Sequence, residues 1–278
     1  MTNFEKMRYI GSGATSDVYL HAPDKVIKLF KGAYKLESVN YEARIAESIN
    51  NSKINAPKYH GVVEINDRIG IVYDFIEGEL LFNELISKPF SAIKIIKNLA
   101  RTQFELNKLV VEGLPSQTER LSFLIKDSNK IPEYQDLIIA ELNNISQTTY
   151  VCHGDFHVGN IIRTEKELFI IDWMNCYSGN REGDILRSYL MLTSPFIPFA
   201  MNRVKKRCFM LYKIFLGKIF LREYLAISGI RRSSLRKWWP IIAAARLADN
   251  VPNEEEWLKN KIRKNMKYLT NKDSYRGI

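Results

Sequence analysis

The chain has 278 residues, 46% of them hydrophobic and 26% charged, which is typical of a globular protein with enough apolar residues for one large domain or two lobes. It has no apolar run of the roughly 18 residues that span a membrane, no signal peptide and no CxxC pair among its three scattered cysteines, so we expect a cytoplasmic protein without a transmembrane segment, disulfide scaffold or thiolate zinc site. The net charge of +10 is confined to residues 201–250 and no nucleic-acid-binding motif accompanies it, so we expect no nucleic-acid partner.

The first 75 residues are predicted to form mainly strands. Short β-type runs at 7–13, 16–22 and 24–30 are separated by turn residues, and the Ala, Glu and Leu content of 33–50 indicates a helix. Two more strands are predicted at 60–65 and 68–75, joined at Asn66 and Asp67. Three strands, a helix and two strands make an α+β pattern.

The first predicted turn is rich in glycine. The stretch IGSGATSDVYL (10–20) places Gly11, Ser12 and Gly13 between two strands. Small residues allow backbone N–H groups to come close to phosphate oxygens. The alternative is a hairpin turn that uses glycine for a positive φ angle, and the residues alone leave both interpretations open.

A lysine interrupts the third predicted strand. The run DKVIKLF places Lys28 among apolar residues. A lysine there can reach the α- and β-phosphates of a nucleotide if a carboxylate holds it, and Glu42 on the next helix is a candidate. The alternative is an exposed lysine at the edge of a sheet.

From residue 79 onward the chain is predicted to be mainly helical. Strands at 148–152, 160–163 and 167–172 interrupt the helices, and residues 76–78 are the expected boundary between a sheet lobe and a helical lobe. Residues at 3–4 spacing mark one late helix face, which we expect to be core; the alternative is a basic amphipathic helix near 204–228 at a membrane surface. The residues of that face are Cys208, Leu211, Tyr212, Phe215, Leu216, Ile219 and Phe220.

Polar side chains gather in the stretch VCHGDFHVGNII (151–162). A carboxylate such as Asp155 can orient a hydroxyl and accept its proton. Asn160 offers an amide oxygen to a hard cation, and Asp172, at the end of a strand, offers a second oxygen. One Asn and one Asp fit Mg²⁺, which binds few protein oxygens together with phosphate oxygens. Zinc binding by His153 and His157 fits poorly, because no third ligand is obvious.

These residues carry a resemblance. HGDFHVGN followed by IIDW resembles the catalytic loop and metal motif of the aminoglycoside phosphotransferase/choline kinase family, relatives of the protein kinases. The resemblance extends from about residue 8 to at least 190. It implies an α+β, two-lobed protein-kinase-like fold, with a small antiparallel-sheet lobe (1–77) that binds the nucleotide and a larger, mainly helical lobe (78–278) for catalysis and substrate binding.

The resemblance also implies roles for individual residues. Asp155 is then the catalytic aspartate and Asn160 and Asp172 bind Mg²⁺. Lys28, paired with Glu42, holds the α- and β-phosphates of ATP, and the glycine-rich turn covers them.

Further roles follow from the hinge and the histidines. IVYDFIEGE resembles the family hinge, which implies Tyr73 as gatekeeper and backbone groups of Asp74 and Ile76 on the adenine, with GTP as an alternative nucleotide. His153 would brace the loop. His157 takes the position where serine/threonine kinases have a phosphate-neutralising lysine, which implies a phosphate contact.

The sequence departs from the family pattern at two positions. Ser16 replaces the third glycine of a kinase-type GxGxxG, and Val158 stands where many relatives have proline. Neither change removes a catalytic group. A pseudokinase would lack Asp155, Asn160 or Asp172, and all three are present, so we expect an active enzyme.

The expected acceptor is a hydroxyl of a small molecule. Protein kinases insert an activation segment ending in an APE-type motif after the metal aspartate, whereas Asp172 is followed within about ten residues by NREGDILRSYL, a predicted turn and helix start. Asp184 is expected to be a structural residue of that helix start. The alternative is a kinase-like module that acts on a protein or membrane-associated partner.

Late acids are the candidates for binding a polycationic acceptor. An aminoglycoside needs a carboxylate-lined pocket, to which Asp249, Glu254, Glu255 and Glu256 could contribute. Their alternative is a first-turn helix charge pattern, favourable with the helix dipole, which we prefer. An aminoglycoside-like antibiotic, an amino alcohol and a sugar all remain possible acceptors, and the sequence leaves the oligomeric state open.

Overall fold

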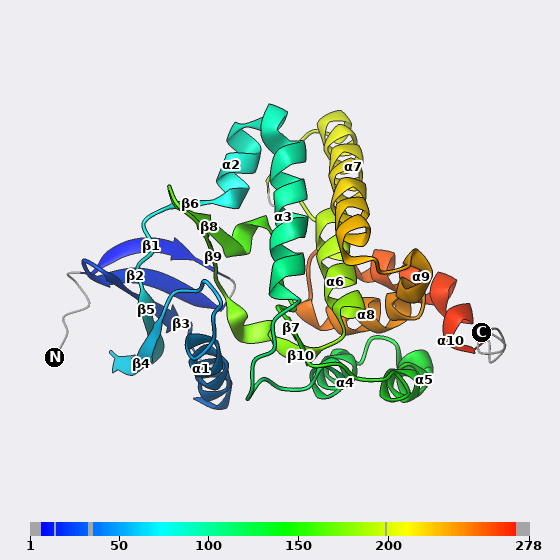
Figure 1. Ribbon diagram of the computed structural model, residues 1–278, viewed down its shortest axis with the longest axis horizontal. Coiled ribbons are helices and arrows are strands. Elements are labelled where there is room, and N and C mark those ends of the chain that lie inside the picture. Colours follow the sequence, from blue (N-terminus) through cyan, green and yellow to red (C-terminus); the bar gives the residue numbers. More distant parts are fainter. Residues whose placement is uncertain (1–6, 14, 33–35, 198, 271–278) are drawn as a thin grey trace. The chain divides into compact units, whose positions relative to one another are not determined.

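The computed structural model describes residues 7–13, 15–32, 36–197 and 199–270 (Figure 1). The chain divides into two compact units that alternate along the sequence. We call them the sheet unit (Met1–Ser87, Val111–Leu114 and Val158–Cys176) and the helical unit (Lys88–Val110, Pro115–His157 and Tyr177–Ile278). The division of nucleotide binding and catalysis at residue 77 stays a prediction.

The sheet unit is built on a five-stranded antiparallel sheet with the order β1-β2-β3-β5-β4. The turn between β4 and β5 has Asn66 and Asp67 at φ 48° and 60°, the left-handed pair of a tight hairpin. The five predicted strands and the helix are confirmed, although predicted helical residues 33–35 lie outside the described residues. The elements are β1 (Arg8–Ser12), β2 (Ser16–Ala22), β3 (Lys25–Phe30), α1 (Leu36–Asn50), β4 (Tyr59–Ile65) and β5 (Arg68–Asp74).

Alternating side chains of the sheet form two small cores. Ile27 and Leu29 of β3 pack in one cluster with Ile65 and Val72. A second cluster contains Phe30 and Ile71 together with residues of α1. The packing of this second cluster therefore fixes the position of α1 relative to β3.

A second, three-stranded sheet in the same unit has the order β6-β8-β9. The predicted strands at 160–163 and 167–172 correspond to β8 and β9, while β6 begins where only helix was predicted. Backbone atoms also join the residue just before β8 to the residue just after β9, since the N–H of Ile171 donates to the carbonyl of Asn160 at 3.0 Å. The elements are β6 (Glu79–Leu80), α2 (Leu81–Ser87), η3 (Val158–Asn160), β8 (Ile161–Arg163), β9 (Leu168–Ile170) and η4 (Trp173–Asn175).

The helical unit surrounds a buried helix, α8, whose Ile241–Ala245 are fully buried. The strand predicted at 148–152 is β7, and it pairs with β10, which was not predicted. Local sequence explains several helix starts; Ser116 and Glu119, for example, form a reciprocal capping box before α4. The elements are η2 (Pro89–Ser91), α3 (Ala92–Leu106), α4 (Gln117–Ser128), α5 (Pro132–Asn143), β7 (Tyr150–Cys152), β10 (Tyr177–Gly179), α6 (Arg181–Thr193), α7 (Arg203–Ser228), η5 (Arg232–Leu235), α8 (Trp238–Arg246), η6 (Leu247–Asp249), α9 (Glu255–Asn265) and α10 (Lys267–Thr270).

Helix α7 corrects one prediction about the core. It lies beside α3 and α6 (Figure 1), and it buries Leu216 and Phe220 as expected. However, Leu211 and Phe215 of the predicted core face are 62% and 50% exposed. The 3–4 spacing correctly predicted a helix with an apolar face, but only part of that face belongs to the core. At 26 residues α7 is also much longer than α3, with 15, and α6, with 13.

Within the described residues, no helix combines the length and the apolar character that crossing a membrane requires.

Candidate functional site

Lys28 is held between two carboxylates of the sheet unit. Its Nζ lies 2.7 Å from Oε1 of Glu42 on α1 and 2.9 Å from Oδ1 of Asp172. Burial by itself would lower the pKa of Lys28, but the two carboxylates outweigh it and raise that pKa. Strand β3 pairs with β2 and β5 on its two sides, which excludes the edge-lysine alternative. A charged lysine is thus fixed in one orientation.

Asp172 and Asn160 lie on neighbouring segments of the same unit. The backbone bond between Ile171 and Asn160 brings the segments together, and Asp172 has a left-handed φ of 63°. The Asp172 side chain is 46% exposed, whereas Asn160 is buried. The described residues hold no cluster of three or more His, Cys, Asp or Glu side chains that could bind a metal. A pair of one amide and one carboxylate fits Mg²⁺, which keeps several other oxygen ligands, better than zinc.

The glycine-rich turn is closed by its own backbone. The N–H of Gly13 donates to the carbonyl of Ser16 at 2.8 Å, and Ser12 Oγ donates to Asp17 Oδ1 at 2.8 Å. Neither Gly11 nor Gly13 has a left-handed φ, and a Cβ on Gly11 would meet no described atom within 4 Å. The positive-φ alternative therefore fails for both glycines. Ala14, inside the motif, lies outside the described residues.

The end of β5 lies near the Lys28 group. Burial, together with the carboxylates of Glu42 and Asp172, raises the pKa of Tyr73 well above its usual value. The carboxylate of Asp74 contacts Lys25 Nζ and His60 Nε2, each at 2.6 Å. The backbone N–H of Asp74 donates to the carbonyl of Lys58. Ile76 follows two residues after the strand ends.

Helix α6 supports the loop that follows β7. Gly154, at φ 73°, donates its N–H to Oδ1 of Asp184 at 2.9 Å. Asp184 is buried in the first turn of α6 and also accepts bonds from Gln103 and Asn107. Its predicted structural role is confirmed. His153, also buried, accepts the backbone N–H of the residue after Gly154 at 3.2 Å.

Asp155 sits within this braced loop, with its Oδ2 3.5 Å from Nε2 of His157. Burial alone would raise the pKa of Asp155, but His157, Arg187 and His153 outweigh it and hold that pKa well below its usual value. The carboxylate is therefore ionised throughout the neutral pH range, as a proton acceptor must be.

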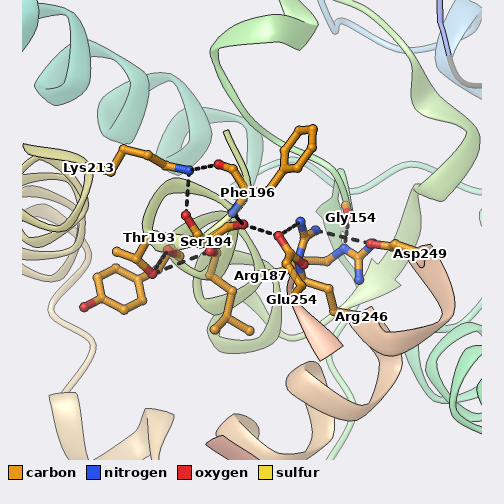
Figure 2. Close-up of polar contacts among 11 residues, drawn as sticks. Gly154, Arg187, Thr193, Ser194, Phe196, Lys213, Arg246, Asp249 and Glu254 are labelled. Atoms are coloured by element: carbon orange, nitrogen blue, oxygen red, sulfur yellow. Dashed lines mark hydrogen bonds and ion pairs between the residues drawn. The ribbon is translucent and has the colours of Figure 1, made fainter. Parts of the chain in front are cut away.

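A buried arginine that sequence reasoning missed connects this loop to η6 (Figure 2). Arg187 is 2% exposed, donates through Nε to the carbonyl of Gly154, and contacts Oδ2 of Asp249 at 2.8 Å. Arg246 contacts the same oxygen at 3.2 Å. The available signal was the spacing: Arg187 follows Asp184 by three residues, so both lie on one face of α6.

The four late acids do not share one environment. Glu254 is 1% exposed; it accepts bonds from Arg246 at 2.8 and 2.9 Å and from Ser194 Oγ. Glu255 and Glu256 occupy the first turn of α9, as the helix-charge alternative expects, and Glu256 is 74% exposed. Asp249 neutralises two arginines. A substrate role for these acids stays a prediction. The contacts that the structure shows for them are ion pairs with arginine and lysine side chains of the protein itself.

Comparison with known proteins identifies the family. Residues 6–206 match the family described as the phosphotransferase enzyme family, abbreviated APH. The chain belongs to this family. Curated protein sequences contain no match to this phosphotransferase.

Solved structures of similar fold cover nearly the whole phosphotransferase chain. The apo form of a thermostable mutant of aminoglycoside phosphotransferase APH(4)-Ia is 11% identical, with 96% of this chain and 95% of that one covered at a TM-score of 0.62. The gentamicin complex of APH(2'')-IIa is 19% identical, with 96% and 91% covered at 0.56. Choline kinase from Cryptosporidium parvum Iowa II is 14% identical, with 95% and 89% covered at 0.53. These matches and the family confirm the predicted resemblance, the kinase-like fold and the phosphotransferase class.

The phosphotransferase should depend on Glu254 for stability. We expect Glu254→Ala to lower the free energy of unfolding by about 3 kcal/mol, because it removes the carboxylate that accepts two hydrogen bonds from buried Arg246 and leaves that arginine only its longer contact with Asp249 at 3.2 Å. Glu256→Ala, two residues away and exposed, is the matched control and should change it by less than about 0.5 kcal/mol. Urea unfolding measures both; equal effects of the two substitutions would contradict the buried-pair interpretation.

Lys213 predicts a pH dependence of stability. This α7 residue donates to the carbonyls of Ser194 and Phe196, each at 2.7 Å (Figure 2), and burial lowers the pKa of Lys213 from 10.5 to about 8. Between pH 8 and pH 10.5 the unfolded chain binds a proton at Lys213 that the folded chain does not. The contribution of Lys213 to the free energy of unfolding is therefore fully present above pH 10.5 and is lost as the pH falls through about 8.

The Lys213→Met variant isolates this effect. The free energy of unfolding of the wild type, relative to Lys213→Met, should increase as the pH rises from about 8 to 10.5. Lys218→Met, on the exposed face of α7, is the control. Urea unfolding across this pH range gives the comparison, and a difference that does not vary with pH would show that the folded chain keeps Lys213 protonated.

Proposed function

We propose that this phosphotransferase moves the γ-phosphate of ATP, with Mg²⁺, to a hydroxyl of a small molecule. The observation that carries the proposal is Lys28, fixed at 2.7 Å from Glu42 and 2.9 Å from Asp172. A partly buried lysine, kept in its charged form by two carboxylates, beside an accessible aspartate suits binding of nucleotide phosphates and their metal. Solved structures of the same fold include an ADP complex of APH(2'')-Ib and an AMP-PNP complex of APH(4)-Ia with hygromycin B, which favours the same nucleotide class here.

The nucleotide is proposed to bind to residues of the sheet unit. Lys28 contacts the α- and β-phosphates, and Glu42 holds its ammonium group in place. The turn at 11–13 is proposed to cover the phosphates, because its small residues allow close approach and no described contact otherwise requires glycine at position 11. The N–H of Gly13 already donates to Ser16, so it is not one of the phosphate donors. Tyr73 lines the adenine site, and backbone groups of Asp74 and Ile76 hydrogen-bond the base.

Asn160 and Asp172 are proposed to hold the metal. Their amide and carboxylate oxygens are hard ligands, and their segments are joined by the backbone bond between Ile171 and Asn160. When bound, Mg²⁺ neutralises charge on the phosphate oxygens. Asp172 also contacts Lys28, so one carboxylate orients both positive groups.

Asp155 is proposed to act on the acceptor. Its ionised carboxylate accepts a hydrogen bond from the acceptor hydroxyl and takes its proton. The hydroxyl oxygen forms a bond to the γ-phosphorus, and the bond from that phosphorus to the bridging oxygen breaks, releasing ADP. His157, 3.5 Å from Asp155, is proposed to contact the phosphate, while Arg187 holds the loop through Gly154.

A small molecule is the proposed acceptor. After Asp172 come only η4 and β10 before α6 begins at Arg181, which leaves no length for the activation segment of a protein kinase. Solved structures of this fold include complexes with gentamicin, streptomycin and hygromycin B, and choline kinases. An aminoglycoside, an amino alcohol or a sugar is therefore the class to test first.

Mass spectrometry of a mixed acceptor panel tests this function. Aminoglycosides, other hydroxylated antibiotics, choline, ethanolamine and sugars are incubated with the protein, Mg²⁺ and either ATP or GTP. We expect one panel member to gain the mass of a phosphate with the wild type and not with Asp155→Ala. If the protein binds ATP but phosphorylates none of these while a protein substrate becomes labelled, the small-molecule proposal is wrong.

A further inference from the structure

The first half of α7 is a strongly basic and unusually exposed surface of the helical unit. Arg203, Lys205, Lys206 and Arg207 are all exposed, and no described residue forms an ion pair with any of them. The sequence contains no acid between Asp184 and Glu223, so nothing local balances this charge. The four cations therefore face solvent without a local counter-charge, although at 100° per residue they are spread around the helix and do not share one face.

This charge is unfavourable for the isolated helix. Cations near a helix N-terminus oppose the helix dipole. Arg203 also lies three and four residues before Lys206 and Arg207, at spacings where like charges repel. The helix nevertheless starts there, with the Asn202 side chain accepting the N–H of Lys205 at 2.9 Å. Contact with an anionic partner would offset this repulsion.

An apolar stripe runs along the same exposed part of α7. Val204, Leu211 and Phe215 are 73%, 62% and 50% exposed, and Cys208 between them is also exposed. Their spacings of four, three and four residues place them on one helix face. At 100° per residue this face lies opposite the buried face, on which Phe220 packs.

Cations border this stripe on both sides. By the same rotation, Lys205 falls on one flank of the stripe and Arg207 on the other. Toward the C-terminus of the helix, Lys218 and Arg222 fall on the face of the stripe itself, so the apolar stripe ends there. Long basic side chains beside apolar ones can bury their methylene stems and keep their charges at a polar boundary. This is the arrangement of a helix that lies in the interface of a bilayer.

We infer that the first half of α7 docks the enzyme onto an anionic phospholipid surface. The flanking cations Lys205 and Arg207 would contact lipid phosphates while Val204, Leu211 and Phe215 enter the boundary between head groups and acyl chains. A nucleic acid would satisfy the cations but leave three large apolar side chains in water. Anionic lipid satisfies both parts of the surface. The inference is independent of the proposed phosphoryl transfer.

Vesicle sedimentation with the full-length protein, without nucleotide, tests this inference. Vesicles of phosphatidylcholine with phosphatidylglycerol should bind the wild type, more weakly at high salt, and pure phosphatidylcholine should not. Lys205→Gln/Arg207→Gln should lower the partition constant about 30-fold. Leu211→Gln/Phe215→Gln should lower it on the order of 10-fold. Thermal unfolding monitored by circular dichroism confirms that both variants are folded.

A charge-matched control makes the result specific. Lys53→Gln/Lys126→Gln removes the same number of charges from exposed positions outside α7 and should bind like the wild type. Equal loss in this control would reduce the effect to net charge and overturn the inference. Absence of binding to anionic vesicles would do the same. If the protein does not bind lipid but binds DNA or an acidic protein, and if Leu211→Gln/Phe215→Gln leaves that binding unchanged, the first half of α7 is a surface for that partner instead.

Discussion

Asp155→Ala is expected to lower the turnover number by about 1,000-fold or more while ATP affinity stays within a few-fold of the wild type. The variant removes the only group proposed to accept the hydroxyl proton. Gly154 remains bonded to Asp184 and to Arg187, so the loop keeps its backbone supports. Turnover of the identified acceptor and equilibrium binding of ATP are the two measurements.

Two further variants sharpen this test. Asp155→Asn keeps the shape of the side chain and removes its charge, so it should lose turnover nearly as fully as alanine. Asp127→Ala changes an exposed aspartate of α4 in the same unit and should leave turnover unchanged. Near-normal turnover of both Asp155 variants would refute the proposed role of this carboxylate.

Asp172→Ala should abolish the strengthening of ATP binding by Mg²⁺. Asp172 supplies the accessible carboxylate of the proposed metal pair, and its loss leaves Asn160 as a single neutral ligand. Lys28 keeps its contact with Glu42 at 2.7 Å, so metal-free ATP should still bind. Titration calorimetry with ATP, with and without Mg²⁺, separates the two effects.

Asp24→Ala provides the control for this substitution. Asp24 is a 75% exposed aspartate in the turn before β3 and lies 3.3 Å from Lys25. Its removal should leave Mg²⁺-dependent binding intact. If Asp172→Ala binds Mg·ATP as tightly as Asp24→Ala does, Asp172 is not a metal ligand and the metal must be held by other groups.

The sheet unit was largely predictable because its information is local. Alternating apolar residues and the Asn66-Asp67 turn specify strands and a hairpin without reference to the rest of the chain. Lys28 stood out in its strand for the same reason. Its second partner, Asp172, is 144 residues away, and no pattern in the sequence specifies that contact.

Helix α7 shows where periodicity stops being informative. A 3–4 repeat identifies an apolar face, but burial also needs a neighbouring element of sufficient length. Leu216 and Phe220 pack against the protein, whereas Leu211 and Phe215, nearer the start of a 26-residue helix, stay exposed. Arg187 was missed because its partners are a backbone carbonyl and an acid from distant segments, and the only local sign of it was its position three residues after Asp184 on one face of α6.

The buried arginines and acids of the helical unit constrain how this sequence can evolve. Arg187 and Arg246 face Asp249 and Glu254, two positive charges against two negative ones. A neutral residue at any one of these positions would leave a charge without compensation in the interior. Related sequences should therefore keep all four charges or lose them in opposite-charge pairs. The four positions would then be inherited as one unit, so an acid near the C-terminus would co-vary with the arginine that holds the Gly154 loop.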